Sequence, residues 1–136
     1  MAVGRITRIG KNIALNRAYK DIPDYTPPKY IAIGSGGSVT AVEGDTNLNT
    51  IEFLDKYNNV DSKLYKVLDS VVINESERSV TIQVTLNALE GTDVDINELG
   101  VFNDDATKKL TSRDTHDIIT KNDNQEVRIT MVNEIV

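Results

Sequence analysis

The residues best suited to acid–base chemistry surround the single histidine, His116. An imidazole beside a carboxylate can act as a general base. Asp117 is not expected to orient the ring, because adjacent residues of a strand point to opposite faces. Asp114, two residues away, shares the face of His116. No nucleophile elbow is present to complete a triad, so we interpret His116 as a surface or strand-edge residue and expect no catalytic residues and no enzyme.

Three acidic residues, Asp93, Asp95 and Glu98, are candidate ligands for a calcium ion, which binds oxygen atoms from closely spaced side chains. The full pattern of a calcium loop is absent, so we expect no metal. With 21 acidic residues in the chain, pairs of carboxylates arise by chance, and a glycosidase pair is not predicted either.

A glycine-rich turn, residues 34–38, follows the short apolar run Tyr30–Ile33. A turn of this kind after a strand can cradle a phosphate group. This turn lacks the dinucleotide-binding spacing, the Gly-Lys-Ser/Thr ending and a helix directly behind it. We therefore expect a flexible turn and no cofactor.

The amino-acid composition excludes several classes of protein. A chain of 136 residues fits one domain, and the absence of cysteine excludes disulfides, thiolate metal sites and a cysteine nucleophile. The lack of tryptophan argues against a sugar-binding platform of stacked aromatic rings. The first residues lack the continuous apolar core of a secretion signal, and no run approaches the ~20 apolar residues of a membrane span. We expect no membrane partner.

The net charge of −6 argues against a nucleic-acid partner, since such proteins usually present a basic face. Basic residues nevertheless gather near the start of the chain, at Arg5, Arg8, Lys11, Arg17 and Lys20. We interpret them as a solvated or partner-facing segment, and a phosphate-tracking patch is the less favoured alternative.

Residues 1–28 are expected to form an extended N-terminal docking arm that contains a short helix over Asn12–Tyr19. The apolar face of this helix is thin, so it suits a partner as well as its own core. Three prolines, at positions 23, 27 and 28, favour an extended turn after it. A second short helix is predicted over Asn47–Lys56, with Asp45 or Thr46 as its cap.

The remainder, residues 29–136, has the pattern of a β domain. Apolar and polar residues alternate along Ser79–Asn87 without a break, which is typical of a strand with one buried and one wet face. The run Leu64–Ile73 precedes it across a charged turn, which predicts an antiparallel hairpin. Further strands are expected over 29–34, 94–103, 109–113, 116–121 and 126–135. The pattern predicts an antiparallel β-sandwich of about six or seven strands, with one or two short helices.

The wet face of Ser79–Asn87 carries uncharged side chains in an otherwise highly charged chain. We interpret this face as a contact surface between copies. The candidate partner-binding residues are Arg5, Arg8, Lys11, Arg17, Thr81, Gln83 and Thr85.

Several segments follow one another in an order that is similar to a known family. They are Tyr30-Ile-Ala-Ile-Gly-Ser-Gly36, Gly44-Asp-Thr-Asn-Leu48, Val80-Thr-Ile-Gln-Val-Thr-Leu86, Ile96-Asn-Glu-Leu-Gly-Val-Phe-Asn103, Leu110-Thr-Ser-Arg113 and Ile119-Thr-Lys-Asn-Asp123. From Tyr30 to Ile135 the chain resembles the domain that opens many bacteriophage tail-fibre and tail-collar proteins, and related baseplate components. The most distinctive match is Ile96–Asn103. Its Gly100 predicts a bulge or a close backbone approach, and a solvated, energetically minor pair is expected between Glu98 and Arg113.

The resemblance implies a virion structural protein, made in the host cytoplasm, that assembles with other virion proteins in a tail, baseplate, collar or fibre attachment. It implies no catalytic residues, and the chain stops soon after the last strand, so we expect no fibre shaft. Symmetry of tails and fibres favours a homo-oligomer related to a trimer or hexamer. Two alternatives stay open: a capsid decoration or head-fibre protein, and a small carbohydrate-binding or hydrolytic β module.

Overall fold

The computed structural model describes residues 2–54 and 63–134. In these ranges the chain has one helix and nine strands. They are β1 (Ala2–Ile6), α1 (Arg8–Tyr19), β2 (Pro28–Gly34), β3 (Ile51–Glu52), β4 (Lys66–Val67), β5 (Ser70–Asn74), β6 (Ser79–Leu86), β7 (Ile96–Asn103), β8 (Leu110–Ile119) and β9 (Val127–Glu134).

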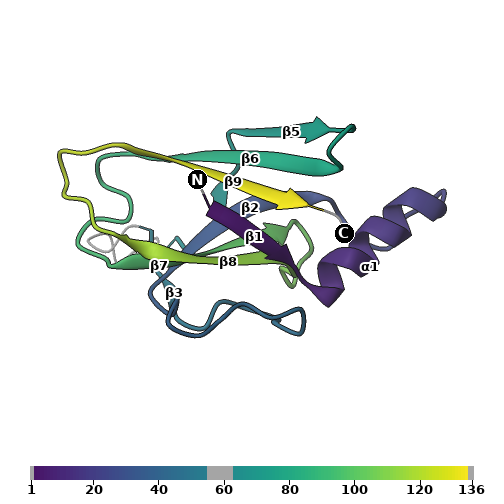
Figure 1. The fold of residues 1–136 in the computed structure, drawn as a ribbon, viewed down its shortest axis with the longest axis horizontal. Helices are drawn as coiled ribbons and strands as arrows, with labels where there is room; N and C mark the ends of the chain where they lie inside the picture. The colour runs from purple at the N-terminus through teal and green to yellow at the C-terminus, as the bar shows by residue number, and fades with distance from the viewer. Residues whose placement is uncertain (1, 55–62, 135–136) are drawn as a thin grey trace.

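The strands form a β-sandwich, as the sequence predicts (Figure 1). One layer has six strands, in the order β3-β2-β7-β8-β1, with β4 also paired to β2. The second layer has three strands, in the order β9-β6-β5. Strand β1 connects the layers, because it pairs antiparallel with β8 on one side and parallel with β9 on the other.

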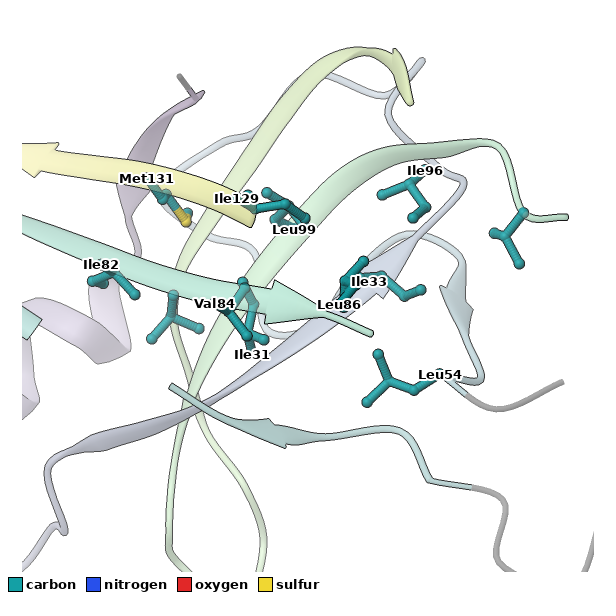
Figure 2. Packing of buried hydrophobic residues seen from close by; sticks show 12 residues of the cluster. Ile31, Ile33, Leu54, Ile82, Val84, Leu86, Ile96, Leu99, Ile129 and Met131 are labelled. Carbon is teal, nitrogen blue, oxygen red and sulfur yellow. The ribbon is translucent and has the colours of Figure 1, made fainter. Parts of the chain in front are cut away.

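The core lies between the two layers. Figure 2 shows Ile82, Val84 and Leu86 of β6 and the apolar residues of β9 facing β2 and β7. The alternation along Ser79–Leu86 is confirmed, since Ile82, Val84 and Leu86 are buried while the residues between them are half-buried. Burial of these aliphatic side chains is the main force that holds the layers together.

A second, smaller apolar cluster covers the outer face of the six-stranded layer. It consists of Ala32, Leu48, Phe102 and Leu110, flanked by Tyr30, Ile51 and Tyr65. Leu48 belongs to the long loop of residues 35–50, which crosses this face. A Cβ on Gly100 would lie 2.7 Å from Leu48 Cδ2, so the predicted close approach at this glycine is confirmed.

The start of the chain differs from the expected extended arm. Residues 2–6 form β1 within the sandwich, and the helix begins at Arg8 and not at Asn12. The segment after the helix is also tied down, because the Asp105 carboxylate accepts hydrogen bonds from both N and Oγ1 of Thr26. These two bonds lower the pKa of Asp105. Within 1–28, α1 is therefore the element that stands outside the two layers (Figure 1).

The expected helix over Asn47–Lys56 is wrong over its described part, residues 47–54, where the chain forms a loop and strand β3. Leu48 and Leu54 have helical spacing, but they enter clusters on opposite sides of the six-stranded layer. The backbone N–H groups of Asn49 and Thr50 bond to Glu98 and cannot serve a helix. Residues 55 and 56 lie outside the described residues.

Three other predicted strands have different bounds. The run Leu64–Ile73 is divided into β4 and β5, and the chain changes layers between them, since β4 pairs with β2 and β5 with β6. The two short strands expected over 109–113 and 116–121 are one continuous strand, β8. The hairpin of β5 and β6 is confirmed, with Asn74 opposite Ser79 at its turn.

Candidate functional site

The most elaborate polar arrangement centres on the carboxylate of Glu98, which is fully buried. Its Oε1 accepts hydrogen bonds from the backbone N–H of Gly36 at 3.0 Å and of Thr50 at 2.7 Å. Its Oε2 accepts from Asn49 N at 3.0 Å and from Arg113 Nε at 2.8 Å. All four donors bond to one carboxylate, and these hydrogen bonds offset the energetic cost of burying its charge.

The guanidinium of Arg113 completes this arrangement from the neighbouring strand β8. Besides Glu98, it donates to Asp45 Oδ2 at 3.1 Å and to the carbonyl oxygens of Gly36 and Val39. Arg113 is only 1% exposed. The expectation of a solvated, minor pair between Glu98 and Arg113 is therefore wrong. The pair is buried because the loop of residues 35–50 lies over it.

This arrangement also settles the role of the glycine turn. A Cβ on Gly37 would lie 2.1 Å from Asn97 O, so the turn lies directly on β7. The amides of Gly36 and Gly37 donate to the side chains of Glu98 and Asn97. The turn does cradle an anion, as glycine turns can, but that anion is a carboxylate of the same chain.

The three candidate calcium ligands do not act together. Glu98 bonds to Arg113 and to the loop, whereas Asp95 accepts a hydrogen bond from Thr120 Oγ1 at 3.1 Å. Asp93 has a positive φ of 56° in the turn before β7. Among the described residues, no three His, Asp or Glu side chains gather in a way that could hold a metal ion.

The histidine lies in a polar row along one face of β8, made of Ser112, Asp114 and His116. Ser112 Oγ accepts a hydrogen bond from Asn133 Nδ2 of β9 at 2.9 Å. Asp114 is buried, and its Oδ2 has no hydrogen-bond partner in the described part of the chain. Burial raises the pKa of Asp114 to about 6, while the positive charges of His116 and Arg113 act in the opposite direction. The row joins the two layers, because Ser112 of β8 bonds to Asn133 of β9.

Of the seven candidate partner-binding residues, the basic ones divide between two elements. Arg5 is an exposed residue of β1, opposite Arg113 in the register. Arg8, Lys11 and Arg17 lie on α1, where Lys11 pairs with Glu43 at 3.2 Å and Arg17 Nη1 donates to Tyr25 O. The charged groups therefore surround the helix and do not form one continuous basic patch with β1.

Helix α1 is attached to β8 by a small contact. Thr7 caps it, accepting from Gly10 N at 3.0 Å and donating to Leu110 O at 2.6 Å. A Cβ on Gly10 would lie 2.1 Å from Thr111 O, so the helix and the strand touch at this glycine. Within the helix, only Gly10 and Ile13 are buried.

The outward face of α1 has apolar residues that sequence reasoning missed. Leu15 is 58% exposed and Tyr19 is 84% exposed. Spacings of three and four residues place Arg8, Lys11, Leu15 and Tyr19 on one face of the helix. The signal was present in the sequence as an apolar pair four residues apart, Leu15 and Tyr19.

The other three candidates, Thr81, Gln83 and Thr85, lie half-buried on the outer face of the three-stranded layer. In this layer Thr81 is opposite Val72, which is 60% exposed, and Gln83 is opposite Ser70. This face is thus uncharged along β6 and β5, with Val72 as the exposed apolar residue of β5.

Strand β5 also exposes its other face. Val71 lies opposite Ile82 and Ile73 opposite Val80, so both belong to the inner face that elsewhere forms the core. Ile73 is nevertheless 73% exposed. The six-stranded layer therefore does not extend over β5, and an apolar overhang remains at the edge of the sandwich. The run of three β-branched residues, without alternation, was its sequence signal.

Two shallow hollows lie among the described residues. One, of about 330 Å³, is lined by Ser35, Glu52, Phe53, Asp93, Val94 and Asp95. The other, of about 310 Å³, lies above the loop residues that hold Arg113. No helix in the described ranges is long and apolar enough to cross a lipid bilayer.

Comparisons of the chain with protein-family models, with curated proteins and with solved structures find no match.

Proposed function

We propose that the chain is a structural protein of a bacteriophage particle, a component of the tail, baseplate, collar or fibre attachment. It acts by assembling with other virion proteins, including further copies of itself. The resemblance of its ordered segments to tail-fibre and tail-collar domains is the origin of this proposal.

The observation that carries the proposal is the meeting of those segments at one place. The glycine turn supplies Gly36, the segment Gly44–Leu48 supplies Asp45, and Ile96–Asn103 supplies Glu98. Arg113, at the end of the next segment, binds all three of them. Residues that are far apart in the chain thus form a single buried unit, which supports reading the segments as one family pattern and not as separate coincidences.

The surface of the sandwich supports an assembly role. Large exposed apolar residues on β5 and α1 are not covered by any described part of the chain. Such patches on a folded domain usually mark contacts with other proteins. The uncharged outer face of β6 adds a flat surface that suits a protein partner.

Electron microscopy of phage particles assembled without this chain tests the proposal. Particles with missing or incomplete tail structures are the expected result. Particles with intact tails and vacant sites on the head would instead assign the chain to the capsid. Intact particles, together with binding of the purified chain to a glycan array, would overturn the assembly role.

A further inference from the structure

We infer that α1 of one copy docks against the β5 overhang of a second copy, in a head-to-tail contact that repeats around a ring. This inference rests on the proposed assembly function and specifies the surface used. In a single chain both surfaces leave apolar residues exposed, and the charges of the two surfaces are opposite in sign.

The helix has the properties of an element that needs a second partner. Its own sandwich buries only Gly10 and Ile13, and it leaves Leu15 and Tyr19 in water. Ile22, three residues beyond Tyr19, is exposed as well. A helix laid across the uncovered face of a sheet is a standard way to bury both surfaces.

The overhang offers the matching apolar surface. Val71 and Ile73 continue the inner face of the three-stranded layer beyond the end of the core. A further strand of the six-stranded layer, if there were one here, would cover these two side chains. Burying them against Leu15 and Tyr19 would remove apolar area from water on both copies.

The charges of the two surfaces are opposite in sign. Helix α1 has three basic residues and no acidic one. The β5–β6 hairpin carries exposed Asp69, Glu75 and Glu77 against a single basic residue, Arg78. Arg8 makes no side-chain ion pair within the described ranges, so it is available to a neighbouring copy. Such complementarity favours encounter and fixes orientation.

The same charges disfavour the simplest alternative, in which the β5 edges of two copies pair with each other. An antiparallel pair centred on Val72 would place Asp69 of one copy opposite Glu75 of the other. A pair centred on Ile73 would place Asp69 opposite Glu77. Like charges directly across a strand pair are destabilising.

A contact between two different surfaces of the same chain is heterologous. When the rotation between neighbouring copies closes, such contacts generate a ring, as in the three- and six-fold parts of a tail.

Mixing two disabled variants tests the inference. The helix variant is Leu15→Asp with Tyr19→Asp, and the edge variant is Val71→Asp with Ile73→Asp. We expect the unmodified chain to form a closed oligomer by light scattering, and each variant alone to be a monomer. An equimolar mixture is expected to form a dimer and nothing larger, because one intact helix then meets one intact edge.

The control variant is Leu89→Asp, which changes an exposed apolar residue away from both surfaces and should leave the oligomer intact. Circular dichroism and thermal unfolding check that each variant is folded. If the edge variant unfolds, the double variant Val71→Thr with Ile73→Thr is used in its place, because threonine keeps the preference for a strand.

Three results would overturn the inference: a monomeric unmodified chain at high concentration, a helix variant that still oligomerises, or a mixture that stays monomeric. None of these would contradict assembly with other virion proteins, although a monomeric unmodified chain would remove assembly with further copies from the proposed function. The microscopy of particles that lack the chain decides that role separately.

Discussion

Glu98 Oε2 accepts a hydrogen bond from Arg113 Nε at 2.8 Å, and the two side chains, from neighbouring strands, are almost completely buried. The pair does more than join β7 to β8. Through Gly36, Asn49 and Thr50 it holds both ends of the loop of residues 35–50 against the outer face of the six-stranded layer.

Replacing Arg113 tests this relationship. Arg113→Met leaves the Glu98 charge buried without its counter-ion, and we expect the free energy of unfolding to fall by about 3–5 kcal/mol. Urea denaturation measures the loss. Lys29→Met is the matched control, because Lys29 forms an exposed pair with Asp104 at 3.2 Å, and its removal should lower the free energy of unfolding far less. Equal, small losses for both variants would contradict a structural role for the buried pair.

The buried carboxyl of Asp114 predicts an unusual pH dependence. Its pKa rises from 3.8 when unfolded to about 6 when folded, so folding takes up a proton between these values. The contribution of Asp114 to stability is therefore present at low pH and is lost as the pH rises towards 6. At neutral pH the buried, ionised carboxyl lowers the free energy of unfolding by about 3 kcal/mol at most.

Asp114→Asn removes that titration, and we expect the variant to be the more stable protein at neutral pH. The difference in unfolding free energy between the two proteins should shrink as the pH falls from about 6 to about 4. Asp117→Asn, at the exposed position directly after His116, is the control for the loss of one carboxylate from β8. A pH-independent difference for Asp114→Asn would show that folding does not change the pKa of this carboxyl.

The close contact at Gly10 predicts how α1 can be released. Gly10→Ala would place a Cβ 2.1 Å from Thr111 O, so the helix must move away from β8. We expect a loss of about 1–3 kcal/mol and faster cleavage of the helix by a protease. Ala14→Gly, at an exposed position of the same helix, controls for helix propensity, which costs only about 1 kcal/mol. Unchanged cleavage in Gly10→Ala would mean that the contact does not hold the helix.

Under the proposed function, the outer face of β6 is a contact surface between copies of the chain in the assembled particle. Thr81→Lys with Gln83→Lys adds two charges to the uncharged outer face of β6. The predicted result is a folded protein whose incorporation into particles falls at least tenfold, a change that corresponds to about 1.4 kcal/mol in contact energy. Quantitative mass spectrometry of purified particles measures it. Thr107→Lys, at an exposed position of the turn between β7 and β8, shows whether an added charge alone has this effect. Normal incorporation of the double variant would remove this face from the assembly model.

Much of the sandwich follows from local patterns. Strands β6, β7 and β9 and the β5–β6 hairpin were all predicted, because alternation of apolar and polar residues reports directly which side of a strand is buried. The loop of residues 35–50 was mistaken in part for a helix. Its apolar spacing was helical, but its amides bond to Glu98, a residue 48 positions beyond Thr50. No local pattern contains that information.

The sequence by itself determined that this is a β domain with one strand, Ser79–Leu86, that has a dry face and a wet face, and it identified the segments that resemble tail proteins. The tertiary structure decided where those segments meet, that β1 connects the layers, and that Glu98 and Arg113 are buried together. It also decided which apolar residues stay exposed on α1 and β5. The reason is physical: the polarity of a side chain is a local property, whereas its burial depends on partners as distant as Thr7 and Leu110, which are 103 residues apart.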